Sequence, residues 1–424
     1  MVSAMFNNLR LAATASLSIT VATALSAQGV NPASAPLALP NTTTSLSAPL
    51  AVSEKRSDDA INANATPSAK EESKEARDAK AIKPVEKIPH IALILPLTSK
   101  TFGRVADAVK QGFIAGANAD GKNAPVWRIY SADDDTVSLT TQYRKATNDG
   151  ATAIIGGVTR DGATIMVRES GLVPSLALNA PTNPTANAGA NATEADLPER
   201  FFYVSLNLDW EARLAARAAA NDGLRRVAVV TAGTPLARRV QESFEKEWIR
   251  LGGEIALRFA VNIDTTDGTR VASAMEKATA DVVFLAADIK IARFARPYLP
   301  PGMPVFATSM TIDPRADAVE NLDLENVRFM EMPWFVQPDH PAVMAYSKPS
   351  EPLPIDYERL YALGIDAWRL AQLVQRDPRA EKSKSPPALD GVTGRITLEG
   401  HQFVRMLAAG EMRDGRPALF KPGE

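Results

Sequence analysis

Cysteine is absent from the 424 residues of this sequence. Its absence excludes disulfide bonds, thiolate nucleophiles and cysteine metal ligands, and it agrees with an oxidising compartment, where a free thiol is a liability. It also excludes the lipobox cysteine to which bacterial lipoproteins attach their lipid. We therefore do not expect a standard outer-membrane lipoprotein.

Histidine is scarce, and His90, His340 and His401 lie in separate segments. Neither a His-Glu-x-x-His nor a Gly-x-Ser-x-Gly pattern occurs, and these are signatures of zinc proteases and serine hydrolases. Asp133-Asp134-Asp135 lacks the glycine and distal glutamate of a calcium loop, so we expect it to cap a helix. We accordingly expect no enzyme, no catalytic residue, no metal and no cofactor.

Neither sign of charge dominates, because 47 basic and 49 acidic residues leave a formal charge of -2. Nucleic-acid-binding proteins usually carry a clear basic excess, so we expect no nucleic-acid partner.

Long apolar runs are also missing. The apolar, uncharged stretch from Leu11 to Leu25 is shorter than the ~20 residues of a membrane-spanning helix,. With Arg10 before it and small residues at Leu25-Ser-Ala27, it predicts a signal peptide over residues 1–27 and export to the periplasm. An alanine-rich segment without this role is the alternative interpretation. We expect no integral membrane segment after cleavage.

Residues 28–87 form a segment of low complexity. No charged residue occurs from Gln28 to Ser53, whereas charges of both signs crowd the stretch from Glu54 to Lys87. Such a composition buries too little apolar surface to offset chain entropy, so we interpret it as a disordered linker. A solvated helix over Glu71 to Lys83 is the alternative for its second half.

From His90 onward, short apolar runs alternate with helical apolar spacing, which is typical of parallel sheets with helical crossovers. The first lobe begins with a strand at Ile91 to Leu95 and a helix from Val105 to Ala117. The same alternation restarts after the strand Phe201 to Leu206 and predicts a second lobe. We expect an α/β fold of two lobes, each a mostly parallel sheet flanked by helices.

The last third of the chain is predicted to return to both lobes. Ile355 to Val374 has the apolar face of a long helix, which we assign to the first lobe. Glycine punctuation and alternation from Gly391 to Met406 predict a hairpin, which we assign to the second lobe. The predicted boundaries are 88–205 plus 337–388 for lobe one and 206–336 plus 389–424 for lobe two, with three interlobe crossings that would form a hinge.

Several segments resemble the type I periplasmic binding protein fold, and within it the LppC or LpoA-like penicillin-binding protein activators. They include Ile94-Leu-Pro-Leu97, Pro174 to Asn179, Phe306-Ala-Thr-Ser309 and Met332-Pro-Trp334. The resemblance covers roughly His90 to the end. It implies a non-enzymatic periplasmic regulator of peptidoglycan synthesis that docks on a class A penicillin-binding protein. The activators are lipoproteins with a helical-repeat domain before this fold, and the sequence shows neither feature.

Loops at the carboxyl ends of the predicted strands supply a candidate ligand cleft. Free N–H groups at the helix start after Thr159 would face a small polar ligand. The resemblance to amino-acid-binding relatives further implies an acidic group and an aromatic wall, for which Asp288 of the second lobe and Trp334 at the hinge are the candidates. Ordinary helix capping by Thr159 or Asp161, and packing of Trp334 at the hinge, are the alternatives. The candidate cleft residues are Thr98, Ser99, Thr159, Arg160, Asp161, Asn179, Thr182, Asp288, Thr308 and Trp334.

Two functions remain open at this point. The resemblance favours the penicillin-binding protein activator, whereas a polar cleft would suit the solute-binding protein of an ABC transporter for an amino acid or similar ligand. A charged helix face with Arg238, Arg239 and Arg250 is either a docking surface or simply solvated,.

Overall fold

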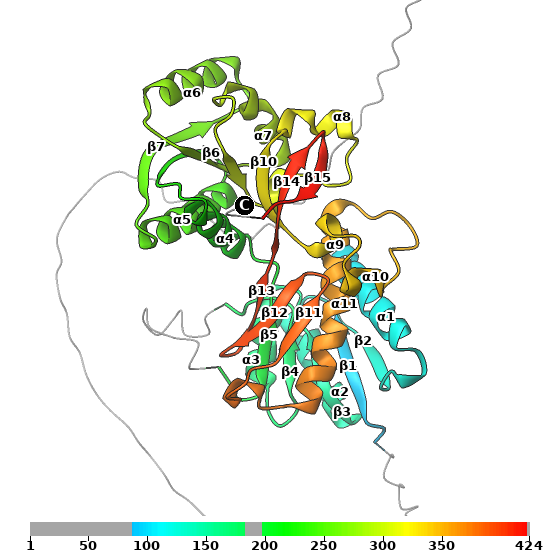
Figure 1. The fold of residues 1–424 in the computed structure, drawn as a ribbon. Coiled ribbons are helices and arrows are strands. Elements are labelled where there is room, and N and C mark those ends of the chain that lie inside the picture. The colour runs from blue at the N-terminus through cyan, green and yellow to red at the C-terminus, as the bar shows by residue number, and fades with distance from the viewer. Residues whose placement is uncertain (1–86, 183–196, 422–424) are drawn as a thin grey trace, which may run out of the picture. The chain divides into compact units, whose positions relative to one another are not determined.

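The computed structural model describes residues 87–182 and 197–421. The predicted signal peptide, nearly all of the linker and residues 183–196 lie outside the described residues. Two lobes, each built on a mostly parallel sheet with helices, account for the described chain, as the sequence predicts (Figure 1).

The first sheet has eight strands, and its central strands are parallel. Residues Ile91, Leu93 and Leu95 of its first strand face one buried core and Ala92 and Ile94 face another, which is the pattern of a sheet covered on both sides,. Its strands, in spatial order, are β11 (Ala388–Gly391), β12 (Gly394–Glu399), β13 (Gln402–Met406), β5 (Phe201–Val204), β4 (Ser175–Ala177), β3 (Ala151–Gly156), β1 (His90–Leu95) and β2 (Trp127–Ser131).

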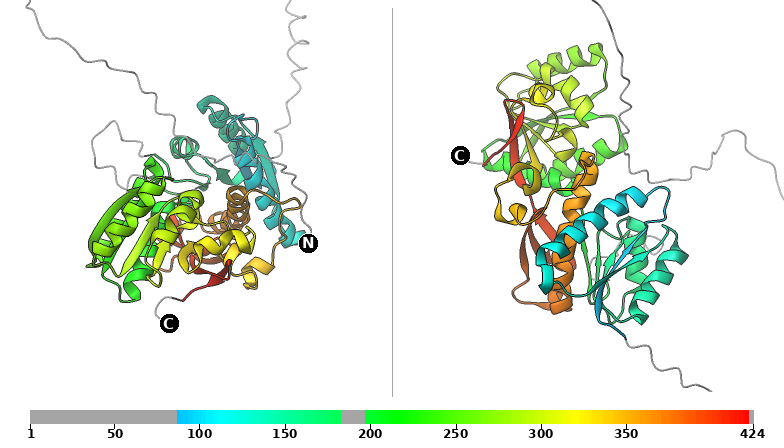
Figure 2. Two further views of the ribbon diagram at one scale, coloured as in Figure 1. Left: turned by 90° about the horizontal axis from the view of Figure 1, so that it is seen from above. Right: turned by 90° about the vertical axis from the view of Figure 1, so that its right-hand side faces the viewer.

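Four long helices accompany this sheet, and together they form the first lobe. Two of them, α1 and α11, supply residues to one core, and the other two supply residues to the opposite core. Figures 1 and 2 show α1 beside α11. The helices are α1 (Gly103–Asp120), α2 (Thr136–Asn148), α3 (Arg160–Glu169) and α11 (Ile355–Arg376).

The second sheet has seven strands, of which the five from β6 to β10 are parallel. Its two faces contribute to separate cores. The strands, in spatial order, are β15 (Arg416–Leu419), β14 (Ala408–Arg413), β10 (Val327–Glu331), β9 (Val305–Ala307), β8 (Val282–Ala286), β6 (Arg226–Ala232) and β7 (Glu254–Val261).

The second lobe comprises this sheet and the five helices that accompany it in the described chain. They are α4 (Leu208–Asn221), α5 (Pro235–Arg250), α6 (Thr265–Lys277), α7 (Ile289–Ala295) and α8 (Ala318–Asn321). Two short helices, α9 (Pro333–Val336) and α10 (Pro341–Met344), connect β10 to α11. The chain therefore passes from the first sheet to the second after β5, returns to the first after β10, and passes to the second again after β13.

The predicted hairpin exists, but its assignment to the second lobe is wrong. Strands β12 and β13 pair antiparallel, and β13 pairs parallel with β5 of the first sheet at Gln402↔Tyr203 and Phe403↔Val204. Only β14 and β15 join the second sheet, and Figure 1 shows β13 leading into β14. Alternation identifies a strand, whereas the free edge that receives it, here β5, is a long-range property.

Candidate functional site

The predicted cleft residues after β1 and β4 fasten neighbouring loops of the first lobe. Thr98 donates its hydroxyl to the carbonyl of Ala132 at 2.8 Å. Ser99 Oγ accepts from the amides of Thr101 and Phe102 before α1. Asn179 Nδ2 donates to the carbonyl of Val158 at 3.1 Å, which joins the loops after β3 and β4.

The start of α3 shows the capping arrangement that the sequence left as an alternative. Thr159 Oγ1 accepts from the amide of Gly162 at 3.0 Å. Arg160 and Asp161 are exposed in the first turn, where an acidic side chain stabilises the positive end of the helix dipole,. Thr182 shares a 2.7 Å hydroxyl contact with Thr164.

The second-lobe candidates occupy three different environments. Asp288 caps α7 by accepting from the amides of Lys290 and Ile291. Thr308 is fully buried, and its hydroxyl has no hydrogen-bond partner among the described residues. Trp334 is packed at the junction of the lobes, 1% exposed, and donates Nε1 to Glu358 at 2.9 Å. Asp288 and Trp334 thus have hydrogen-bond partners within the protein, whereas the Thr308 hydroxyl has none among the described residues. A role of the three residues in ligand binding stays a prediction.

The three histidines also hold local structure. His90 Nε2 contacts the Tyr130 hydroxyl at 2.8 Å, and His401 Nδ1 contacts the carbonyl of Phe201 at 2.7 Å. His340 Nδ1 accepts from the amide of Ala342 at the start of α10. Asp135 caps α2, as the sequence predicts for the aspartate run. Across residues 87–182 and 197–421, no group of three or more histidine, aspartate or glutamate side chains is arranged to hold a metal ion.

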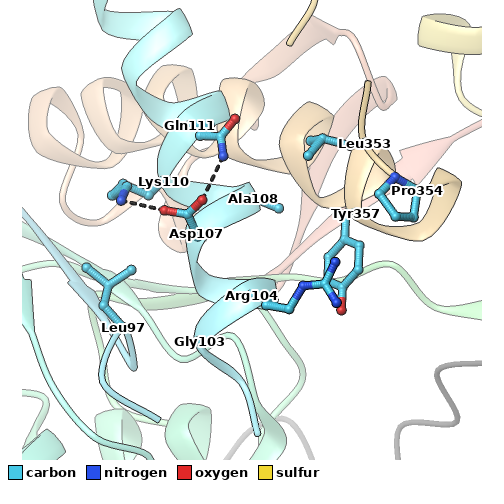
Figure 3. Close-up of a pocket in the computed structure, with 10 residues that line it drawn as sticks. All are labelled: Leu97, Gly103, Arg104, Asp107, Ala108, Lys110, Gln111, Leu353, Pro354 and Tyr357. Atoms are coloured by element: carbon cyan, nitrogen blue, oxygen red, sulfur yellow. Dashed lines mark hydrogen bonds and ion pairs between the residues drawn. The ribbon is translucent and has the colours of Figure 1, made fainter. Parts of the chain in front are cut away.

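An open groove of about 390 Å³ lies between α1 and the beginning of α11, outside the predicted cleft (Figure 3). The guanidinium of Arg104 lies 5.0 Å from the ring centroid of Tyr357. Asp107 pairs with Lys110 at 2.5 Å and accepts from Gln111 at 2.7 Å. The lining mixes charged groups with the apolar side chains of Leu97, Leu353 and Pro354, so it suits an amphipathic ligand or peptide better than a purely apolar one.

The junction between the lobes holds a set of buried ionisable residues that the sequence analysis missed. Arg359 on α11 of the first lobe donates Nη2 to Glu331 Oε2 at 2.6 Å and to the carbonyl of Ser309 at 3.0 Å. Glu331 ends β10, and Ser309 follows β9, so both belong to the second lobe. The amide of Ser309 donates to Glu211 Oε2 on α4 at 2.9 Å. We call Glu211, Ser309, Glu331 and Arg359 the interlobe cluster.

Burial and the neighbouring carboxylate of Glu331 raise the pKa of Glu211 to about 7. Burial disfavours the charge on Arg359, but Glu331, Asp356 and Glu211 together hold its pKa above the usual range. Arg359 is therefore the permanent cation of the interlobe cluster.

Two further buried groups support the same junction from the first lobe. Arg405 on β13 donates to the carbonyls of Ser205 and Thr393. Asp366 on α11 accepts from the amides of Val392 and Thr393 and from the Thr393 hydroxyl. Burial raises the pKa of Asp366 and lowers that of Arg405.

A second set of contacts between the lobes surrounds Trp334. Arg315 of the second lobe pairs with Glu358 on α11 and donates to the carbonyl of Leu353. The ammonium of Lys348 lies 3.5 Å from the Trp334 ring centroid. Trp334 is thus packed at the junction of the lobes, and its predicted place in a ligand cleft stays a prediction.

A sequence signal for these residues existed but was ambiguous. Arg359 and Asp366 are seven residues apart, on the buried side of a helix that the sequence analysis interpreted only by its apolar positions,. Charged residues on a buried helix side imply partners, because an unpaired buried charge is costly. Glu211 and Glu331 sit at a helix start and a strand end, where a charge is ordinary.

The charged side of α5 is largely engaged in local ion pairs. Arg250 and Arg217 clamp Glu247 and lower its pKa to about 2. Arg239 pairs with Asp209. These contacts favour the solvated face over the docking surface.

Among the described residues, no helix is both long and apolar enough to cross a membrane. The described residues thus offer an open groove that could bind a ligand or peptide, and a buried polar junction that joins the two lobes.

Comparison with known proteins covers most of the chain. A family profile described as "LppC putative lipoprotein" matches residues 60–407. The penicillin-binding protein activator LpoA of Histophilus somni (strain 129Pt) is 25% identical over 316 residues, which are 73% of this chain and 50% of that protein. The chain thus spans about half the length of the curated relatives it matches.

Solved structures share the fold. The "putative branched-chain amino acid ABC transporter" of Chromobacterium violaceum is 34% identical with a TM-score of 0.64, covering 77% of this chain and 100% of that one. The C-domain of LpoA from Haemophilus influenzae, described as a regulator of PBP1A, is 20% identical with a TM-score of 0.61, covering 78% and 100%. At 20% identity, the second likeness concerns the fold alone.

Proposed function

This chain belongs to the LppC family, and from that premise we propose that it is a periplasmic, non-enzymatic regulator that docks on a class A penicillin-binding protein and activates peptidoglycan synthesis. The observation that carries the proposal is the match to the family over residues 60–407, together with relatives named as penicillin-binding protein activators.

The chemistry of the described residues supports a binding role. All three histidines contact neighbouring groups that hold local structure, and the polar cleft candidates mostly cap helices or fasten loops. A regulator needs a shaped surface and a responsive fold rather than converging nucleophiles and bases.

The contacts between the lobes support the same proposal. Arg359, Arg315 and Trp210 each hydrogen-bond from one lobe to the other. Such a junction presents both lobes to a partner as one surface. The groove at Arg104 and Tyr357 is one concave part of that surface.

The test uses the full chain and a detergent-solubilised class A penicillin-binding protein from the same organism. We expect saturable binding in biolayer interferometry and faster crosslinking of lipid II in a reconstituted assay. An unrelated periplasmic binding protein serves as the control for nonspecific stimulation. Absence of binding together with an unchanged crosslinking rate would contradict the proposal.

A second candidate is a solute-binding protein for an amino acid or a similar polar ligand. It is favoured by the 34% identity to the Chromobacterium violaceum structure over that entire chain. A rise in melting temperature with leucine, isoleucine or valine supports it, because a ligand that binds only the folded state stabilises that state. An unchanged melting temperature at millimolar amino acid, together with binding to the class A penicillin-binding protein, would favour the regulator over the solute-binding protein.

A further inference from the structure

A continuous set of buried hydrogen bonds links α4, the loop after β9, the end of β10 and α11. Glu211 accepts from the Ser309 amide at 2.9 Å, and the carbonyl of the same residue accepts from Arg359 at 3.0 Å. Arg359 also contacts Glu331 at 2.6 Å. Since Arg359 comes from the first lobe and the other three from the second, parting of the lobes would break these contacts.

Only one of the two buried carboxylates, Glu331, is described as bonded directly to a cation. Glu211 and Glu331 are 4% and 1% exposed, and Arg359 is 8% exposed. Arg359 donates directly to Glu331, whereas the hydrogen bond described for Glu211 comes from a neutral amide. The other facing cation, Arg405 on β13, directs its described hydrogen bonds to the carbonyls of Ser205 and Thr393.

The remaining charged groups around the interlobe cluster lie on α11. Asp356 pairs with Arg359 at 3.0 Å, and Asp366 is bound by Val392 and Thr393. Neither donates a hydrogen bond to Glu211 in the described structure. An ionised Glu211 would therefore place a second carboxylate beside Glu331 with no cation bonded directly to it.

We propose that the interlobe cluster is a proton-controlled contact between the lobes, in which protonated Glu211 permits the closed junction and ionised Glu211 favours their separation. Separation hydrates the carboxylate of Glu211 and removes its repulsion from Glu331, so the ionised form is stabilised more in the parted state.

The electrostatics give the pH range. The pKa of Glu211 is raised to about 7 in the closed junction, by burial first and by Glu331 second. In a parted, hydrated junction the pKa of this group would return toward that of an ordinary glutamate. The ratio of parted to closed molecules then rises with pH by up to about tenfold per unit and levels off above pH 7.

The absence of cysteine makes the experiment clean, because two introduced thiols are the only labelling sites. Leu172 in the first lobe and Val319 on α8 in the second are 84% and 72% exposed. The full chain carrying L172C and V319C is labelled with nitroxides, and electron-electron double resonance measures the distance distribution from pH 4.5 to 8.5. We expect a longer-distance population that grows with pH and saturates above pH 7.

E211Q in the same background should hold one distance distribution across this range. E242Q, the same substitution at an exposed position of α5, should leave the pH response intact. An unchanged distribution in the labelled parent chain between pH 4.5 and 8.5 would overturn the proposal without any variant. Retention of the full response in folded E211Q would overturn it as well, and circular dichroism verifies the fold.

Discussion

Gly112 of α1 and Gly364 of α11 face each other so closely that a Cβ built on Gly364 would lie 3.0 Å from the Gly112 Cα and 2.2 Å from the Val109 carbonyl oxygen. A Cβ on Gly112 would lie 1.8 Å from the carbonyl oxygen of Tyr361. The two helices thus meet backbone to backbone, and this contact fixes the position from which α11 presents Arg359 to the second lobe.

We expect G112A to lower the free energy of unfolding by at least 1–3 kcal/mol, the usual cost of overpacking. In an isolated helix the same glycine-to-alanine change would stabilise the helix by about 1 kcal/mol. A loss of stability in G112A therefore identifies the close contact between the two helices. Urea unfolding followed by circular dichroism measures it. G171A is the control, since nothing lies within 4 Å of a Cβ at that position; an equal loss in both variants would contradict the prediction.

Arg359 should be the costliest single cation to remove. R359M leaves Glu331 buried without its 2.6 Å partner, and breaking a buried pair typically costs about 3–5 kcal/mol,. R239M breaks the partly exposed pair with Asp209 and should cost at most about 1 kcal/mol,. Chemical denaturation of the parent, R359M and R239M at pH 7 compares their free energies of unfolding. A small loss in R359M would contradict the prediction and would show that water replaces Arg359 as the partner of Glu331.

The stability of the fold should fall as pH rises toward neutrality through Glu211. Its pKa is raised from 4.5 to about 7, so the folded state binds the proton more tightly than the unfolded chain does. The stabilising contribution is present in full below pH 4.5 and is lost as pH rises to about 7, by about 3 kcal/mol.

The measurement for this prediction is the difference between the parent chain and E211Q in urea at pH 5 and pH 8. Because the glutamine is neutral at both values, E211Q should lose less stability between them than the parent. Parallel pH profiles for the two proteins would rule out Glu211 as the titrating group.

Asp288 provides a test that separates helix capping from ligand binding. D288A should cost about 1 kcal/mol because Lys290 and Ile291 lose their acceptor,. D264A removes the matching cap of α6 and should cost a similar amount. The comparison requires that leucine or a related ligand raises the melting temperature of the parent. Loss of that rise in D288A but not in D264A would assign Asp288 to the ligand cleft. Persistence of the rise in D288A would assign Asp288 to helix capping alone.

Much of the fold could be predicted from local pattern. The continuous apolar run Ile91–Leu95 predicts a buried strand, and the helical spacing of Ile355–Val374 predicts a helix, because both patterns are visible in the sequence itself,. The cap at Asp135 was predictable for the same reason, since its acceptor and donors are two and three residues apart.

The candidate site was harder to predict because its contacts are long-range. Thr159 and Asp288 were predicted as ligand contacts, and the described structure shows both accepting from the amides of the helices they precede, a role that leaves the ligand prediction untested. The side chains that join the lobes were missed because Glu331 and Arg359 are 28 residues apart and come from different lobes.

The sequence by itself determined the two-lobed α/β architecture, the absence of cysteine chemistry and the family resemblance, because these depend on composition and on neighbours along the chain. Only the tertiary structure decided which sheet received β13, how closely Gly112 and Gly364 meet, and that Glu211, Glu331 and Arg359 share one buried space. Those outcomes depend on free strand edges, on backbone approach and on desolvation of charges from distant segments, none of which has a local signature.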